Sequence, residues 1–93
     1  MNLRWTTPAR RDLVAILDYI DDHDPAAASS VLERVESAAI RLRSFPLLGR
    51  EGVVADTREL AIPTLPYLLV YRVRRDAIEI LRVLHGARQW PPT

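Results

Sequence analysis

The residues best suited to chemistry lie near the end of the chain, in the stretch EILRVLHGARQWP at 79–91. It begins as an apolar run and then passes into His85, Arg88 and Trp90. Guanidinium groups bind carboxylates and phosphates through a planar fork and also stack on aromatic rings. The stretch is therefore either a working surface or an ordinary strand end whose tail packs back on the core.

Arginine is the only basic residue type apart from histidine, since all 13 Lys+Arg residues are Arg. This composition is explained either by coding bias or by a need for guanidinium forks. With 12 acidic residues the net charge is +1, so composition gives no electrostatic case for a nucleic-acid partner. We expect direct nucleic-acid binding to be absent.

A chain of 93 residues has room for one domain with one core, spanning 1–93. There is no cysteine, which excludes disulfides and zinc–thiolate sites. The first residues lack the apolar segment of a signal peptide, and no apolar run approaches the roughly 20 residues that cross a bilayer. We expect a soluble, cytoplasmic protein without a membrane partner.

Two amphipathic helices are predicted in the first half of the chain. The first begins with Thr7 as N-cap and ends near Asp22 or His23; the second begins with Asp24 as N-cap and ends before Pro46. In both, apolar residues recur at helical spacing. Because the connection is short, the helices should form an antiparallel hairpin.

Strand signals surround this hairpin. One short strand precedes it at 2–5, and after a glycine-containing loop at 46–54 three more are predicted at 57–62, 67–73 and 77–84. This order predicts an α+β fold. A short N-terminal strand precedes an antiparallel helical hairpin, which packs on one face of a twisted antiparallel sheet of about four strands.

The last hairpin predicts which residues share a face. With Arg75 and Asp76 as a two-residue loop, Arg72 lies opposite Glu79 on the face expected to seat the helices. The other face then gathers the pairs Tyr71–Ile80, Leu69–Arg82 and Tyr67–Leu84. That face is too apolar to stand bare, so either the C-terminal tail or a partner should cover it.

The order of elements, with the segments GREG, TREL, PYLLVYRV, EILRVLH and ARQWP, resembles the RelE/ParE family of toxins from type II toxin–antitoxin pairs. The likeness covers nearly the whole chain and is greater to the ParE branch. RelE-like members cut mRNA on the ribosome, whereas ParE-like members poison DNA gyrase. The resemblance also implies a cognate antitoxin, whose disordered C-terminal segment folds along apolar grooves on binding.

An mRNA endonuclease needs a general acid, a general base and a cation on one surface. The candidates for these roles are Arg58, Tyr67, Arg82 and His85. The chain has no lysine, however, and carries Leu68 where some nuclease members have arginine. These departures make a metal-independent endoribonuclease the alternative reading.

A gyrase inhibitor needs only a binding surface, and we expect this function, with no metal or organic cofactor. The predicted target-binding or antitoxin-binding residues are Tyr67, Leu69, Tyr71, Arg82, His85, Arg88 and Trp90. Arg82 is expected to meet an acidic group of the antitoxin or the target, because an unpaired charge among apolar neighbours is costly. An inactive antitoxin-binding module is the third alternative.

Overall fold

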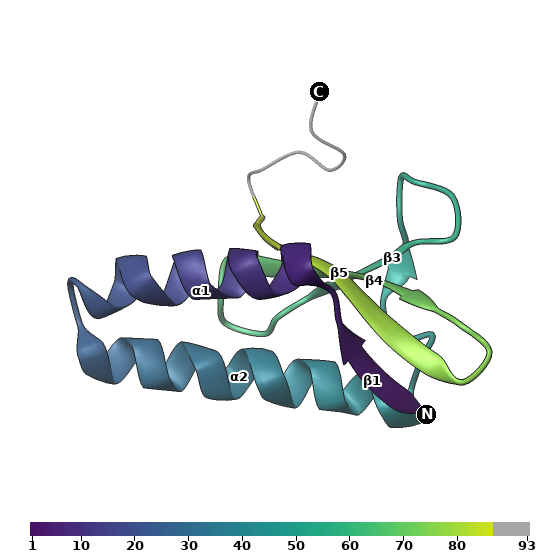
Figure 1. Cartoon of the computed structure of the whole chain (residues 1–93), viewed down its shortest axis with the longest axis horizontal. Coiled ribbons are helices and arrows are strands. Elements are labelled where there is room, and N and C mark those ends of the chain that lie inside the picture. The colour runs from purple at the N-terminus through teal and green to yellow at the C-terminus, as the bar shows by residue number, and fades with distance from the viewer. Residues whose placement is uncertain (87–93) are drawn as a thin grey trace.

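A computed structural model describes residues 1–86 of the chain. Its elements follow in this order (Figure 1): β1 (Asn2–Trp5), α1 (Thr7–Asp21), α2 (Pro25–Ser44), β2 (Arg50–Glu51), β3 (Arg58–Ala61), β4 (Tyr67–Val73) and β5 (Ala77–His85). The strands form one sheet in the order β1-β5-β4-β3-β2. Within this part of the chain, no helix is long and apolar enough to cross a membrane.

The predicted α+β class is confirmed, with the short first strand and the antiparallel helical hairpin (Figure 1). The sheet has five strands rather than about four. It is mixed rather than wholly antiparallel, because β1 pairs with β5 in parallel and the short β2 adds an edge. The loop before β3 thus contributes a strand too short to be recognised from its pattern.

Both helices begin at capping side chains. The N-cap of α1 is Thr6 rather than the predicted Thr7, and its hydroxyl accepts a hydrogen bond from the Ala9 N–H at 3.3 Å. The same hydroxyl donates to the Ile80 carbonyl at 2.8 Å, so one side chain starts the helix and attaches it to β5. Asp24 caps α2 as predicted, accepting from the Ala27 N–H.

The register of β4 against β5 changes part-way along the pair. Near the turn, Arg72 lies opposite Glu79 as predicted. A β-bulge then makes Leu81 the extra residue, so that beyond it Leu69 lies opposite Val83 rather than Arg82. The predicted pairs Leu69–Arg82 and Tyr67–Leu84 are wrong by one residue for this reason.

The helices cover the face of the sheet that was predicted to be open. The core contains Leu69, Tyr71, Ile78 and Ile80 from the strands, packed with residues of α1 and α2 such as Val35. This assignment buries the more apolar face, which the hydrophobic effect favours. The predicted seating of the helices on the Arg72–Glu79 face is therefore wrong, and that face points away from them.

Tyr71 attaches the loop after α2 to the core. Its hydroxyl donates to the Pro46 carbonyl at 2.9 Å and accepts from the Gly49 N–H at 2.8 Å. Burial raises the pKa of Tyr71 above 10.0, against the smaller effects of the Gly49 hydrogen bond and the Arg58 charge. The phenol therefore stays neutral and keeps its donor proton.

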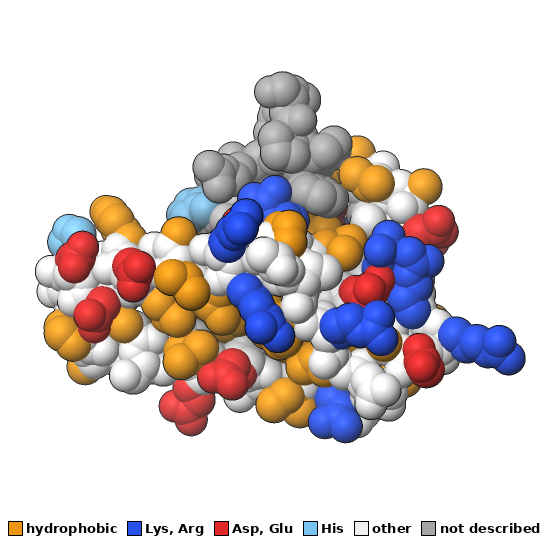
Figure 2. Space-filling view, viewed as in Figure 1, with side chains coloured by type: hydrophobic (Ala, Val, Ile, Leu, Met, Phe, Trp, Pro, Cys, Tyr) orange, Lys and Arg blue, Asp and Glu red, His pale blue; other side chains and the backbone are white. Residues whose placement is uncertain are grey.

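Charged side chains are segregated along the molecule. Figure 2 shows acidic side chains without arginines at the end where α1 meets α2, whereas most arginines lie over the half that contains the sheet, with some acidic side chains among them. The acidic end contains Asp18, Asp21, Asp22 and Asp24. The net charge of +1 is therefore the sum of an acidic end and a half of the molecule that holds most of the arginines.

Candidate functional site

A groove between α1 and the end of β5 brings together two of the predicted site residues. It is lined by Asp12, Ala15, Ile16, Tyr19, Tyr67, Val83 and His85. Tyr67 and His85 are cross-strand partners whose rings meet edge to face, with centroids 5.9 Å apart. With the predicted pair Tyr67–Leu84 on one face, strict alternation would place His85 on the other. The bulge at Leu81 instead places Tyr67 and His85 on the same face.

Arg82 is paired within the chain. Its Nε and Nη2 donate to the two oxygens of Asp12 at 2.6 and 3.0 Å, and Asp12 Oδ2 also accepts from the Val83 N–H at 3.0 Å. The hydrogen bond to Asp12 raises the pKa of Arg82, while burial opposes the rise. The premise that Arg82 lacks a partner within the chain is wrong, because α1 supplies Asp12. That Arg82 also meets an acidic group of the antitoxin or the target stays a prediction.

Leu69 and Tyr71 are not accessible to a partner in this structure. Both side chains are completely buried in the core between the sheet and the helices. They were predicted to bind because the face they occupy was taken to be open. Arg88 and Trp90 lie outside the described residues.

Arg58 lies apart from the Tyr67–His85 pair. It stands opposite Tyr71 on the neighbouring strand and donates to the Gly49 carbonyl at 2.8 Å. Tyr71 and Tyr67 are four positions apart on β4, a distance of about 13 Å along a strand. The four side chains predicted for acid–base chemistry are therefore not brought into one group.

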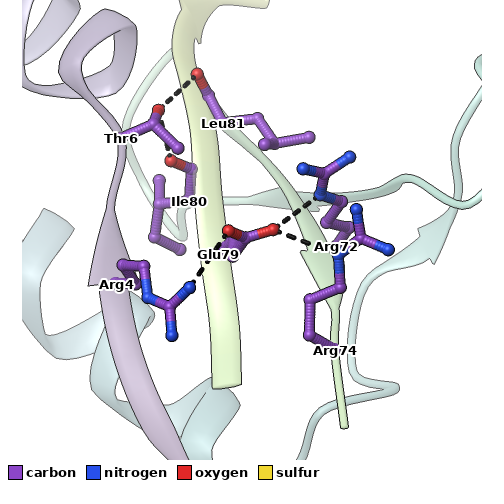
Figure 3. A network of polar contacts seen from close by, with 7 residues as sticks. All are labelled: Arg4, Thr6, Arg72, Arg74, Glu79, Ile80 and Leu81. Atoms are coloured by element: carbon purple, nitrogen blue, oxygen red, sulfur yellow. Dashed lines mark hydrogen bonds and ion pairs between the residues drawn. The ribbon is translucent and has the colours of Figure 1, made fainter. Parts of the chain in front are cut away.

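A second group of charges lies on the face away from the helices. Glu79 accepts hydrogen bonds from Arg72 Nε at 2.7 Å and from Arg74 Nε at 3.2 Å, and Arg4 Nη1 approaches its other oxygen at 3.5 Å (Figure 3). We call Arg4, Arg72 and Arg74 the arginine cluster. The Arg72–Glu79 pair was predicted from the hairpin, but Arg4 and Arg74 were missed.

No three metal-ligating side chains converge anywhere in residues 1–86. The polar groups of the two sites are instead arginine, tyrosine and histidine, each held by a neighbour on another element. These groups can bind anions, donate hydrogen bonds and pack against apolar side chains.

Comparison with known proteins identifies the family. A family model described as "ParE toxin of type II toxin-antitoxin system, parDE" matches residues 3–90. This chain belongs to the ParE toxin family. The predicted membership of the wider RelE/ParE group is confirmed, and the protein is the toxin of a type II toxin–antitoxin pair with an antitoxin partner.

Individual relatives agree with this family. The chain is 44% identical over 89 residues to "Putative toxin Y4kP" of Sinorhizobium fredii, covering 96% of this chain and 92% of that protein. It is 39% identical over 84 residues to "Toxin RelE2" of Caulobacter vibrioides, covering 90% and 93%. A solved structure titled "Chromosomal ParDE TA system from P. aeruginosa" matches with a TM-score of 0.83 at 28% identity, covering 91% and 95%.

The first testable consequence concerns Glu79 of this ParE-family toxin. Hydrogen bonds from Arg72 and then Arg74 hold the pKa of Glu79 below the ordinary carboxylate value of 4.5, and burial opposes them. A carboxylate with a lowered folded-state pKa stabilises the fold above its unfolded pKa and loses this contribution as pH falls through the folded value. We therefore expect Glu79→Gln to be less stable than the wild type at neutral pH. The difference should shrink as pH falls below about 4.5.

Urea unfolding followed from about pH 7 to about pH 3 measures this difference. Glu36→Gln, on the exposed surface of α2, is the matched control and should run parallel to the wild type. A Glu79→Gln curve that also runs parallel to the wild type down to about pH 3 would contradict the role given to the arginine cluster.

Proposed function

We propose that this toxin inhibits DNA gyrase by binding it, and that its cognate antitoxin neutralises it. One observation carries the proposal. The groups that mRNA cleavage would require are dispersed, since Arg82 is bound to Asp12 while Arg58 is bound to Gly49 at the other end of β4. Inhibition by binding needs no such assembly.

The groove beside α1 supports a protein partner. Tyr19 is 69% exposed at its rim, next to Ile16, Tyr67 and His85. Exposed aromatic rings beside an apolar groove are typical anchors of protein interfaces. Gyrase binding and antitoxin binding at overlapping surfaces would explain neutralisation, and both would take place in the cytoplasm.

The mRNA endoribonuclease is the second candidate because of the Tyr67–His85 contact. A phenol and an imidazole with ring centroids 5.9 Å apart, beside Asp12, could exchange protons with a substrate. Two relatives also carry the names "Toxin RelE2" and "Toxin RelE1". An inactive antitoxin-binding module is the third candidate.

Tyr67→Phe and Tyr67→Ala separate these candidates. If the toxin inhibits gyrase by contact, Tyr67→Phe should change the inhibitory concentration in a supercoiling assay by less than about threefold. Tyr67→Ala should raise that concentration about tenfold, because truncating an interface aromatic typically costs more than 1 kcal/mol. If Tyr67 transfers a proton, Tyr67→Phe alone should slow cleavage of ribosome-bound message by about 10²-fold or more.

The wild-type toxin should block supercoiling, leave ribosome-bound message intact, and lose its effect when the antitoxin is added. Cut message with unaffected gyrase would establish the endoribonuclease instead. If the toxin neither blocks supercoiling nor cuts message, the inactive antitoxin-binding module is the remaining candidate. Thermal unfolding of each variant shows whether a lost effect reflects a lost fold.

A further inference from the structure

The face of the sheet away from the helices presents cations and conceals the acids that hold them. Arg4, Arg72 and Arg74 have side chains 58%, 37% and 52% exposed, whereas that of Glu79 is 13% exposed. Arg50 on β2 repeats the arrangement, with its exposed guanidinium 3.1 Å from the buried Glu59. A ligand approaching this face therefore meets guanidinium groups first.

The bonds to Glu79 also fix how the guanidinium groups point. Arg72 and Arg74 both use Nε for this carboxylate, and Figure 3 shows their terminal nitrogens directed away from it. Arg4, Glu79 and Arg72 lie in one row across three neighbouring strands, because the cross-strand register places them directly opposite one another. Cations held in advance lose less side-chain entropy when they bind an anion.

Two members of the arginine cluster, Arg72 and Arg74, also line a hollow beside the loop before β3. The hollow has a volume of about 540 Å³, and three arginines line it: Arg58, Arg72 and Arg74. The rest of its lining comes from the loop before β3 and from single apolar side chains on either side of that loop: Leu47, Glu51, Gly52, Val54, Ala55, Asp56, Thr57 and Val73. The arginines therefore line a concave surface that can surround part of a ligand.

Among residues 1–86, no aromatic side chain lines this hollow. Its exposed large apolar members are Leu47 and Val73, at 66% and 36% exposed, so guanidinium groups outnumber the side chains that could anchor a protein partner. Protein interfaces depend on buried aromatic and aliphatic anchors, whereas contacts to a nucleic-acid backbone are made by arginines on open surfaces. These observations favour phosphodiesters over an acidic peptide.

We infer that the arginine cluster, with Arg50 and Arg58 at its margins, binds phosphodiester groups of a nucleic acid. The near-neutral net charge had argued against such a partner. Net charge fails as a guide here because four of the seven aspartates lie at the other end of the molecule, where α1 meets α2: Asp18, Asp21, Asp22 and Asp24. A polyanion is drawn to the sheet and kept away from the helical tip.

Fluorescence anisotropy with the whole toxin tests the inference without gyrase, so its outcome is independent of the proposed function. The probes are a labelled DNA duplex of about 20 base pairs, a single-stranded RNA of similar length, and a labelled oligoglutamate peptide. Arg4→Gln/Arg74→Gln removes two cluster cations while Glu79 keeps Arg72. Arg10→Gln/Arg11→Gln, on the exposed surface of α1, changes the net charge equally and is the matched control.

At about 25 mM salt the cluster variant should bind duplex or RNA at least tenfold more weakly than the wild type, and the control less than threefold more weakly. The slope of log affinity against log salt should fall by about two in the cluster variant, one for each lost phosphate contact. The probe that shows this loss identifies DNA or RNA as the source of the phosphodiesters.

If both double variants bind nucleic acid equally more weakly than the wild type, the loss of affinity follows from net charge alone, and the inference is overturned. If oligoglutamate binds more tightly than nucleic acid and the cluster variant loses this binding, the site recognises an acidic peptide, and the inference is overturned. Failure of every probe to bind at low salt would also overturn it. Unchanged melting temperatures in both variants exclude loss of the fold as the cause.

Discussion

Replacing Gly49 with alanine is expected to lower the free energy of unfolding by about 2–4 kcal/mol, a large part of the roughly 5–15 kcal/mol typical of a domain. A Cβ at this position would lie 2.7 Å from both Cε1 and the hydroxyl oxygen of Tyr71, and 2.8 Å from the Glu59 carbonyl oxygen. The carbonyl is part of β3, and the ring is completely buried, so neither can give way easily. The substitution also disturbs the hydrogen bond that attaches the loop to Tyr71.

Gly86→Ala is the matched control, because its Cβ would meet nothing closer than the Pro66 carbonyl oxygen at 3.4 Å. Urea unfolding should show a change of less than about 0.5 kcal/mol for this variant. Tyr71→Phe should cost about 1–3 kcal/mol by removing both hydrogen bonds of the hydroxyl. Its combination with Gly49→Ala should cost less than the sum, since the hydroxyl is part of the clash. A Gly49→Ala protein as stable as wild type would show that the loop is not held where the structure has it.

The helices and strands could be predicted because their signals are local. Asp24 and Pro25 start α2 as their types indicate, and apolar spacing sets the lengths of both helices. The Arg72–Glu79 pair followed from a short hairpin in the same way. Such features depend on residues close together in the chain.

The orientation of the sheet could not be predicted because it depends on a bulge and on distant partners. No glycine, proline or other turn residue next to Leu81 signals a bulge, yet Leu81 is the extra residue that shifts every cross-strand pair beyond it by one. Both faces of the last hairpin are largely apolar, so alternation alone did not choose which one the helices cover. The error about Leu69 and Tyr71 follows from that choice.

The two site networks were missed in part for the same physical reason. Arg4 meets Glu79 because β1 pairs in parallel with β5, across 75 positions of sequence. Asp12 meets Arg82 from a helix 70 positions away. The types of these residues were informative, but only the topology brings them together.

Asp12→Asn is the second substitution with a large expected effect, about 2–4 kcal/mol of lost stability. Asp12 joins α1 to β5 through three hydrogen bonds, two from Arg82 and one from the Val83 N–H. Both side chains are largely buried, at 24% and 14% exposed for Arg82 and Asp12, so the neutral amide leaves a partly buried cation without the carboxylate that balances it. Bonds between charged groups are also about twice as strong as neutral ones.

Asp18→Asn on the exposed surface of the same helix is the control, and it should change stability by less than about 0.5 kcal/mol. Because the Asp12–Arg82 pair is largely buried, its contribution should survive added salt, unlike that of a surface pair. The double variant Asp12→Asn/Arg82→Gln should recover at least about 1 kcal/mol relative to the sum of the single changes. Additive losses would mean that the two side chains stabilise the fold separately. That result would strengthen the prediction that Arg82 meets an acidic group of the antitoxin or the target.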